Sequence, residues 1–142
     1  MCLLLEYGAM KKETGNFYMD KVLRALADKT RLRLLNLIGN DEVCVCFFVE
    51  ILGESQPKIS RHLAYLRRAG IVAARREGKW IHYRIVDPQN LHAARVVSEV
   101  RACLAEDKEM QRERKRLVSA FCAPDAPIHL QGAPRPASYV SA

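Results

Sequence analysis

The spacing of apolar residues predicts that the first half of the chain is helical. One apolar helix face begins after Tyr18, and a second begins after Thr30, which we expect to cap its helix. Gly39 is expected to end that second helix. The apolar run VCVCFFVEIL predicts a short third helix that ends at Gly53.

A fourth helix is predicted after a three-residue connection, Gly-Glu-Ser. Ser55 is a natural N-cap, and Pro57 is tolerated in a first helical turn because no N–H donor is needed there. The helix is expected to run to about Ala69 and to stop at Gly70. A short helix, a tight turn and a second helix are typical of a helix-turn-helix. We call this fourth helix the reading helix.

After the reading helix the pattern changes to that of strands. Two β-prone runs, residues 71–75 and 80–86, flank the sequence REGK, in which Gly78 supplies the turn. This pattern predicts a β-hairpin, or wing. The expected fold class is mainly α with a small β-hairpin, a winged helix-turn-helix.

The last third of the chain is predicted to hold one more helix, a charged extension and a tail. The helix is expected to start at Asp87-Pro88 and to carry an apolar stripe as far as Leu104. Charged residues follow, with a break near residues 106–108. Four of the six prolines lie beyond Cys122, which is typical of a disordered segment.

The positive charge of the chain is concentrated in one segment. The net charge is +7, from 23 basic and 16 acidic residues. Between Gln56 and Arg84 there are eight basic residues and a single acidic one, Glu77, whereas the rest of the chain is balanced. Such clustering is expected of a protein that binds a polyanion.

The reading helix has the two faces that DNA recognition requires. Ile59, Leu63 and Leu66 fall on one side and are expected to face the core, while hydrogen-bond donors lie on another side. Such a helix suits the major groove, with its first residues near base edges and the hairpin cations near phosphates. The predicted DNA contacts are Gln56, Lys58, Ser60, Arg61, His62, Tyr65 and Arg68 on the helix, and Arg76 and Lys79, beside Arg75, on the hairpin.

Other functional classes are less well supported by the sequence. A solvated basic face would explain a lone basic helix, but the adjoining turn, hairpin and charge cluster favour DNA. No Ser-His-Asp arrangement, P-loop, dinucleotide-binding turn or HExxH motif is present, so we expect no catalytic residues and no enzyme. No stretch approaches the roughly 20 apolar residues of a membrane span, so no membrane partner and a cytoplasmic location are expected.

Two segments carry a resemblance to a known family. ALADKTRLRLLNLI and EVCVCFFVEILGESQPKISRHLAYLRRAGIVAARREGKWIHYRI resemble the ArsR/SmtB family of bacterial metal-responsive winged-helix repressors, between Tyr18 and Leu104. The portion from SQPKISRHL to KWIHYRI is highly specific. The resemblance implies a homodimer that binds a palindromic operator in double-stranded DNA and leaves it when a metal or metalloid binds. The N-terminal helix and the helix of residues 91–104 would form the dimer surface.

The resemblance also divides the chain into three parts. These are an N-terminal tail or accessory helix over 1–15, an ArsR-type DNA-binding and dimerisation domain over 16–105, and a charged helix extension with a disordered tail over 106–142.

The five cysteines are an odd number at irregular spacing, which is a poor disulfide framework. In arsenic-sensing members of the family, a CVC pair precedes the reading helix, normally with a third cysteine three residues later. Cys44 and Cys46 match the pair, but Val49 stands at the third position. The implied inducer is As(III) or Sb(III), because soft ions prefer thiolates. A third thiolate could come from Cys2, Cys103 or Cys122, or the inducer could be an organoarsenical that needs only two sulfurs.

Zinc-type members bind metal on the last helix, through Asp-x-His and His-x-x-Glu. His92, Glu99 and Cys103 do not reproduce that spacing, so we expect no zinc site on that helix. Three other readings of the protein stay open. It could be a redox- or sulfur-responsive repressor, a constitutive DNA-binding protein with packed core cysteines, or a thiol protein that buffers metal.

The position of the cysteine pair suggests how an inducer would act. If Cys44 and Cys46 lie near the start of one helix, drawing them onto one ion would distort its first turn. The strain would pass through residues 53–55 to the reading helix and change its position relative to the groove.

Overall fold

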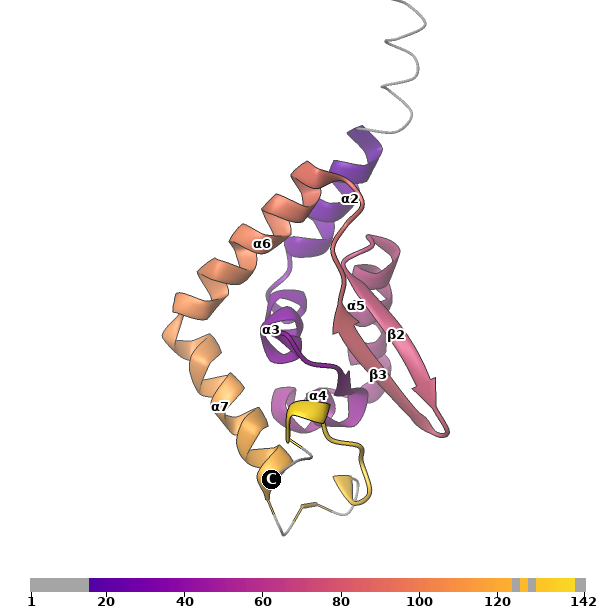
Figure 1. The fold of residues 1–142 in the computed structure, drawn as a ribbon, viewed down its shortest axis with the longest axis vertical. Coiled ribbons are helices and arrows are strands. Elements are labelled where there is room, and N and C mark those ends of the chain that lie inside the picture. The colour runs from indigo at the N-terminus through magenta and orange to yellow at the C-terminus, as the bar shows by residue number, and fades with distance from the viewer. Residues whose placement is uncertain (1–15, 124–125, 128–129, 140–142) are drawn as a thin grey trace, which may run out of the picture.

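The computed structural model describes residues 16–123, 126–127 and 130–139 (Figure 1). The segment 1–15, predicted as a tail or accessory helix, lies outside the described residues, and Cys2 lies there with it. In chain order the elements are α2 (Asn16–Leu26), α3 (Lys29–Ile38), β1 (Val43–Cys44), α4 (Val45–Leu52), α5 (Gln56–Arg68), β2 (Val72–Glu77), β3 (Trp80–Ile85), α6 (Leu91–Glu106), α7 (Lys108–Cys122) and the 3₁₀ turn η2 (Ala137–Tyr139).

The predicted hairpin is confirmed and forms part of a three-stranded antiparallel sheet in the order β1-β3-β2. The hairpin closes between Glu77 and Trp80, and Gly78 has a φ of 59°, which a two-residue hairpin turn requires. The third strand was not predicted. Val43 and Cys44 were assigned to the following helix, but they adopt extended backbone and pair with β3.

Two predicted helix starts are wrong. Asp28, not Thr30, caps α3, because its Oδ1 accepts a hydrogen bond of 3.0 Å from the backbone N–H of Arg31. Helix α6 starts after Asn90, whose side chain accepts from the N–H of Ala93, and not at Asp87-Pro88. In both places a carboxylate or amide side chain satisfies an N–H of the first turn. The predicted break near residues 106–108 is confirmed at Asp107.

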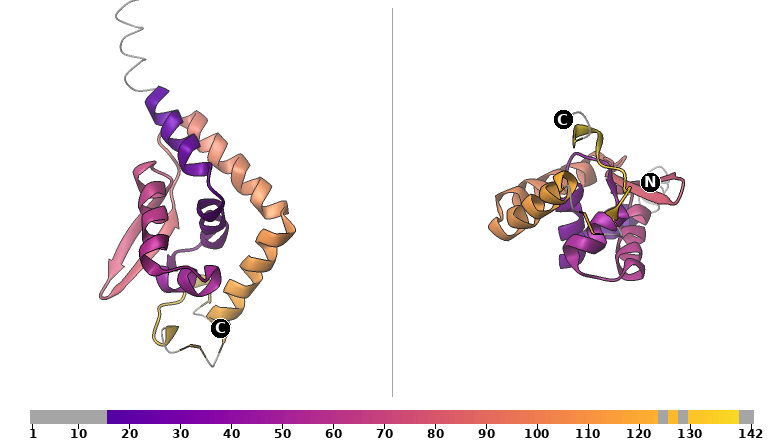
Figure 2. Two further views of the ribbon diagram at one scale, coloured as in Figure 1. Left: turned by 180° about the vertical axis from the view of Figure 1, so that it is seen from behind. Right: turned by 90° about the horizontal axis from the view of Figure 1, so that it is seen from below.

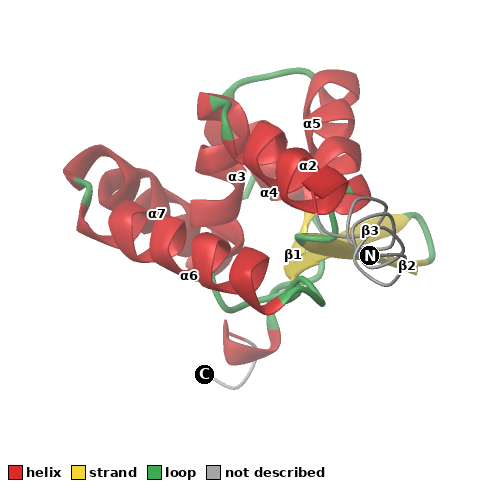
Figure 3. Cartoon of the chain, turned by 90° about the horizontal axis from the view of Figure 1, so that it is seen from above, coloured by secondary structure: helices red, strands yellow, loops and turns green. Residues whose placement is uncertain are grey.

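Helices α6 and α7 form a bent arm that runs along one side of the molecule (Figures 1 and 2). The sheet and α5 lie on the other side of α3, as the view from above shows (Figure 3). The core between them includes the side chains of Leu34, Leu35, Phe48 and Leu63, each at most 1% exposed. Burying such side chains stabilises a fold by about 1.5–3 kcal/mol each.

Helix α7 packs against α3 and α4. Glu113 is 6% exposed, and its carboxylate accepts two hydrogen bonds, of 3.0 and 2.8 Å, from Nε of Arg33 on α3. Phe121 is fully buried and meets Phe47 of α4 edge-on, with the ring centroids 4.8 Å apart. Arg116 donates to the backbone carbonyl of Ile51 at 3.1 Å. Helix α7 therefore supports α4 through Phe121 and Arg116.

The described part of the C-terminal segment also contacts this side of the molecule. Tyr139 packs against Phe121 with ring centroids 5.0 Å apart, and Ser138 Oγ donates to Asp41 Oδ1 at 2.8 Å. The three-part division of the chain stays a prediction, because packing contacts do not show which part folds alone. None of the helices in the described ranges combines the length and apolar character needed to cross a bilayer.

Candidate nucleic-acid interface and thiol pair

Helix α5 has the amphipathic form predicted for the reading helix. Ser55 is its N-cap, and its Oγ accepts from the N–H of Lys58 at 3.4 Å. The side chains of Ile59, Leu63 and Leu66 are fully buried, as predicted. This buried stripe fixes the rotation of the helix, so that the opposite face is presented to solvent.

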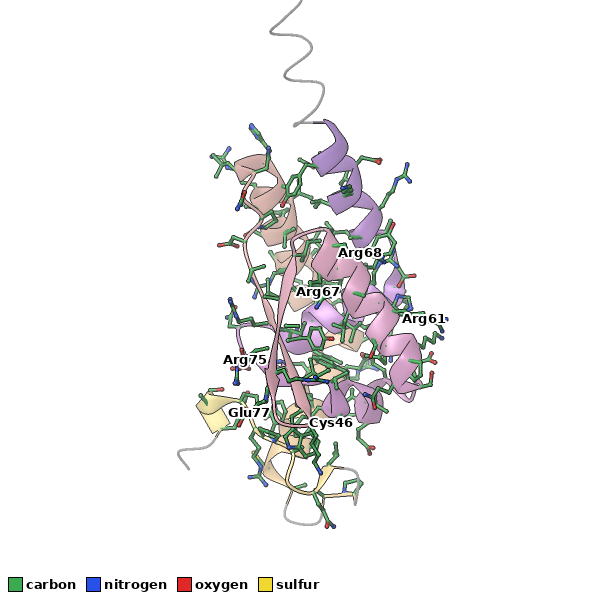
Figure 4. All side chains as sticks on the ribbon, turned by 90° about the vertical axis from the view of Figure 1, so that its right-hand side faces the viewer. Cys46, Arg61, Arg67, Arg68, Arg75 and Glu77 are labelled. Carbon is green, nitrogen blue, oxygen red and sulfur yellow. The ribbon has the colours of Figure 1, made fainter. Side chains whose placement is uncertain are left out.

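The solvent face of α5 carries three arginines. Arg61, Arg67 and Arg68 are all exposed, and Figure 4 shows them along the helix on the side of the molecule that also presents the hairpin. Gln56 is exposed at the N-terminal end, and Ser60 is half-buried. Arg67 was not among the predicted DNA contacts, although it belongs to the same run of basic residues.

Three of the predicted contacts face neighbouring parts of the protein. Lys58 Nζ lies 2.9 Å from Glu54 Oε1, and His62 Nδ1 lies 3.7 Å from an Asp28 carboxylate oxygen. The ring of Tyr65 carries the guanidinium of Arg31 at 4.2 Å. These contacts join α5 to the turn that precedes it and to the α2–α3 junction. They hold the reading helix in place.

Arg31 fixes that junction. Its Nε and Nη2 donate to the backbone carbonyls of Ala25 and Arg24, at 2.7 and 2.9 Å, at the end of α2. Because the same guanidinium lies over Tyr65, one side chain ties α2, α3 and α5 together.

The wing adds further cations next to α5. Arg76 and Lys79 are exposed, and Lys79 Nζ lies 4.8 Å from the centre of the Trp80 ring. Arg75 is engaged differently, because its guanidinium bonds Glu42 at 2.9 Å and Glu77 at 3.3 Å. The hydrogen bond from Arg75 lowers the pKa of the Glu42 carboxyl below its ordinary value.

The exposed cations of α5 and the wing therefore share one side of the molecule, with a helix that stands out from the core. A protruding helix fits the width of the DNA major groove, and cations on a flanking hairpin can reach phosphates. This arrangement is suited to double-stranded DNA.

Cys44 and Cys46 form a close thiol pair at the start of α4. Cys44 is the last residue of β1 and the N-cap of α4, and Cys46 lies in the first turn. The two Sγ atoms are 3.1 Å apart, with Cys46 donating and Cys44 accepting, and both thiols are free. Cys44 is fully buried, whereas Cys46 is half-buried.

The pair is electrostatically asymmetric. The hydrogen bond from the Cys46 thiol lowers the pKa of Cys44 to about 7, against the opposing effect of burial, and backbone hydrogen bonds from Ile81 and Val45 add to the lowering. The same thiol–thiol hydrogen bond raises the pKa of Cys46. Cys44 therefore loses its proton near neutral pH, whereas Cys46 keeps its proton. The thiolate is the form of cysteine that binds soft ions.

Among the described residues, no third ligand joins this pair. Nowhere in those ranges do three or more His, Cys, Asp or Glu side chains gather as a metal site would require. Cys103 on α6 and Cys122 at the end of α7 are exposed. It remains a prediction that another cysteine completes the site. It also remains a prediction that α6 holds no zinc.

A buried histidine beside the pair was not found by sequence reasoning. His82 is 3% exposed and lies opposite Cys44 in the register of β1 and β3. Its Nε2 is 3.0 Å from an Oε atom of Glu77. Nothing in the sequence distinguished His82 from the other scattered histidines, since its position depends on the pairing of β1.

Cys46 of the thiol pair lines one pocket together with residues of α5 and the wing. Gly53, with a φ of 65°, turns the chain sharply between α4 and α5, and brings the start of α5 back beside α4. The pocket between α4, this turn and the wing has a volume of about 530 Å³. It is lined by Val45, Cys46, Val49, Glu50, Gly53, Glu54, Gln56, Lys79 and Trp80. Figure 4 shows Cys46 next to the end of the hairpin.

Comparison with known proteins agrees with this geometry. The family model described as "Bacterial regulatory protein, arsR family" matches residues 28–74. The chain is 38% identical over 107 residues to the arsenical resistance operon repressor of Escherichia coli K12, a match that covers 75% of this chain and 90% of that protein. It is 54% identical over 65 residues to the arsenic resistance transcriptional regulator ArsR1 of Pseudomonas putida, covering 45% of this chain and 51% of the relative.

A solved structure gives the same result for the fold. The homodimeric winged helix-turn-helix DNA-binding domain of Mb0332 from Mycobacterium bovis, described as a possible ArsR-family regulator, matches with a TM-score of 0.55 and 30% identity. The match covers 68% of this chain and 86% of that one. These proteins are transcriptional regulators and not enzymes, and the chain spans nearly all of the E. coli repressor. The chain therefore belongs to the arsR family of bacterial regulatory proteins, as a DNA-binding transcriptional repressor with a winged helix-turn-helix fold.

Proposed function

We propose that this repressor binds its operator as a homodimer and is released when trivalent arsenic or antimony binds the thiolates of Cys44 and Cys46. The observation that carries the proposal is the close thiol pair, with an Sγ–Sγ distance of 3.1 Å, whose Cys46 lines a pocket together with Gln56 and Lys79. A soft trivalent ion prefers thiolate ligands, and the lowered pKa of Cys44 supplies one near neutral pH.

In the DNA-bound state, α5 would lie in the major groove and the wing beside it on the backbone. The base edges would be read from Gln56 and Ser60 at the start of the helix, and Arg61 would bind a base or a phosphate. Lys58, His62, Tyr65 and Arg68 would position the helix or reach the flanking phosphates. The wing would contribute Arg76 and Lys79.

Pairing of two copies would place two reading helices on two half-sites of the operator. Leu23 of α2 and Leu91 of α6 are the exposed large apolar side chains among the described residues, at 50% and 61%. Their exposure supports a dimer surface formed by these two helices.

A regulator that acts on chromosomal DNA would work in the cytoplasm.

Inducer binding would act through the first turn of α4. One ion bound to both sulfurs fixes the Cys44 and Cys46 side chains relative to each other, while α7 supports the other end of α4 through the hydrogen bond from Arg116 to the carbonyl of Ile51. The displacement therefore passes forward, through Gly53 and the Glu54–Lys58 ion pair, to α5. Allosteric coupling of about 1–3 kcal/mol would lower DNA affinity about 5- to 150-fold.

The same thiol geometry favours one alternative, a redox-responsive repressor. Two free sulfurs 3.1 Å apart need to approach by only about 1 Å to reach the disulfide distance of about 2.05 Å. Oxidation would then join the sulfurs with loss of two protons and two electrons to an added oxidant, and it would strain the same first turn.

The test is a fluorescence-anisotropy titration of the reduced protein on a palindromic sequence from its own upstream region. Arsenite, antimonite, zinc, cadmium and the thiol oxidant diamide are added in separate runs. We expect release by arsenite and antimonite, and loss of that response in Cys44→Ser/Cys46→Ser. Release by diamide alone would favour the redox alternative, and tight binding under every condition would contradict both.

A further inference from the structure

We propose that Arg75 is a positioning residue of the regulatory response, and that inducer binding at the thiol pair weakens the DNA contacts of the wing as well as those of α5. This inference rests on the proposed function and deepens it by assigning a second element through which the response reaches DNA. Its starting point is the sheet, because the strand that ends at Cys44 and the two strands of the wing are hydrogen-bonded into one sheet.

Cys44 lies in one row of this sheet with two residues of the wing. It pairs with His82 of β3, and His82 pairs in turn with Arg75 of β2. Directly opposed residues of an antiparallel sheet project their side chains to the same face, so these three side chains share one face. Glu77 shares it too, because it lies two positions after Arg75 in the same strand.

Arg75 joins the two outer strands of the sheet. The strand order is β1-β3-β2, so β1 and β2 are not neighbours. The guanidinium of Arg75 on β2 nevertheless donates from Nε to Oε1 of Glu42 at 2.9 Å, and Glu42 directly precedes β1. Its Nη2 also donates to Oε2 of Glu77 at 3.3 Å. We call Glu42, Arg75 and Glu77 the wing clamp, since they fix the hairpin to the short strand that carries Cys44.

The charges of the wing clamp distinguish Arg75 from the DNA-facing cations. Its guanidinium faces two carboxylates, and the hydrogen bond that it donates holds the pKa of Glu42 below its ordinary value. A phosphate would have to compete with both carboxylates for this guanidinium. The next residue, Arg76, projects to the opposite face of the hairpin and forms no ion pair within the part of the chain that the structure describes. Arg76 is therefore placed to bind phosphate, and Arg75 is placed to hold the wing.

The sulfur of Cys44 is bonded to the wing directly. It accepts a hydrogen bond from the backbone N–H of Ile81 in β3. Ile81 pairs with Arg76 across the hairpin, and Lys79 stands two residues before Ile81, in the turn. Both DNA-facing cations of the wing are thus next to the backbone group that contacts the thiol.

Inducer binding would change the geometry of this row. A Cys44 sulfur that is bound to an ion has fewer lone pairs to accept the N–H of Ile81, and it is drawn toward Cys46 at the same time. Because the wing clamp ties Glu42 to Arg75, a displacement of β1 moves β2 together with β3, and the hairpin shifts relative to α5. The wing cations and α5 then no longer fit one groove and its backbone together.

The first test breaks the wing clamp from each end. The quantity measured is the release ratio, which is operator affinity without arsenite divided by operator affinity with saturating arsenite. Arg75→Gln and Glu42→Gln should each reduce this ratio about threefold or more. Glu42→Gln removes no cation, so its effect cannot come from a lost phosphate contact. The double variant should behave like either single one, because both remove the same bond, and Arg75→Lys should restore part of the ratio.

Two controls accompany these variants. Lys115→Gln removes an exposed cation of α7 and should leave the release ratio as it is in the wild type. Arsenite binding to the DNA-free protein, measured by calorimetry, should stay within about twofold of wild type in Arg75→Gln, because the clamp transmits the state of the thiols and does not bind the ion. Loss of arsenite binding in that variant would overturn the inference, since Arg75 would then only support the thiol pair.

The second test removes the DNA contacts of the wing. Arg76→Ala/Lys79→Ala should lower operator affinity and the release ratio together, because arsenite has fewer wing contacts left to weaken. Arg61→Ala on α5 should also lower operator affinity, but it should reduce the release ratio less. An equal or larger reduction of the ratio in Arg61→Ala would contradict a response that passes through the wing.

The outcomes separate the inference from the proposed function. If arsenite releases the wild type and the ratio is unchanged in Arg75→Gln and Glu42→Gln, the inference is overturned and the arsenical-responsive repressor stands. If arsenite does not release the wild type, both fall together. A ratio that is reduced by Arg75→Gln but not by Glu42→Gln would show that Arg75 acts as a lone cation, which also overturns the inference.

Discussion

Helices α4 and α5 follow each other in the chain and differ in almost every physical respect. Helix α4 is short and apolar, and its ends are fixed by contacts to β3 and α7 that come from far away in the sequence. Helix α5 is longer and polar, and carries its own cap, its own buried stripe and exposed arginines. The difference suggests a division of labour. Under the proposed function, the first helix transmits strain from the thiol pair and the second contacts DNA.

The same contrast separates two kinds of stabilisation. The position of α5 depends on side chains within and next to it, such as Ser55 and the Glu54–Lys58 pair. The position of α4 depends on Phe121 and Arg116, which lie about 70 residues further along the chain on α7. Loss of α7 contacts should therefore affect α4 more than α5.

The largest expected effect comes from removing the ring that supports α4. Phe121→Ala deletes a fully buried side chain that touches Phe47 and should lower the free energy of unfolding by about 3–5 kcal/mol. Urea denaturation measures this. The adjacent exposed residue provides the control, since Cys122→Ala should change stability by no more than about 0.5 kcal/mol. Similar losses for the two variants would show that α7 does not support α4.

A smaller loss is expected from the buried ion pair between α3 and α7. Glu113→Gln leaves Arg33 without its carboxylate and should cost about 2 kcal/mol, less than a fully buried pair would, because Arg33 retains some solvent. Glu109→Gln is the matched control on the same helix. Its carboxylate is 69% exposed and 3.9 Å from Lys29, so we expect a change of about 0.5 kcal/mol or less. Thermal unfolding of both variants measures the two losses of stability.

The third prediction concerns the reading helix and leaves stability unchanged. Arg61→Ala removes an exposed cation of α5 and should weaken operator binding about tenfold and reduce the slope of log affinity against log salt by about 1. Lys115→Ala, an exposed cation on α7, should leave both quantities as they are. The measurement is operator affinity over a range of salt concentrations. Equal effects of the two variants would indicate a general charge effect instead of a defined DNA face.

The smallest expected signal is the titration of a single thiol. Thiolate absorbance in the reduced protein, taken as the difference from Cys44→Ser, should appear with a midpoint near pH 7, because the Cys46 thiol lowers the pKa of Cys44 to about 7. The thiolate form is present above this pH and is lost as the pH falls through it. Cys46→Ala removes the donor and should move the midpoint to higher pH. An unmoved midpoint would show that Cys46 does not stabilise the thiolate.

The parts of the fold that could be predicted are those with local signals. The cap at Ser55, the stripe of Ile59, Leu63 and Leu66, and the Gly78 turn each depend on residues close in sequence, and all three are confirmed. The cap of α3 was predicted wrongly, at Thr30, because Asp28 and Thr30 are both residue types that cap helices and stand two positions apart.

The remaining features depend on contacts that no local pattern contains. Strand β1 forms because Val43 and Cys44 pair with residues of β3 that lie about 40 positions later in the chain. This pairing also buries His82 beside the thiols. The support of α4 by α7 and the pocket next to Cys46 arise in the same way. The sequence predicted the cysteine pair and the basic face, whereas their shared pocket required the three-dimensional arrangement.

The coupling between the thiol pair and the DNA face is tested most directly by its reciprocity. Arsenical binding is measured by calorimetry on the reduced protein, alone and with saturating operator DNA, and operator affinity is measured with and without the arsenical. Linkage requires the two ratios to be equal, and the account predicts that operator weakens arsenical binding about 5- to 150-fold. The same arsenical affinity with and without operator would contradict it.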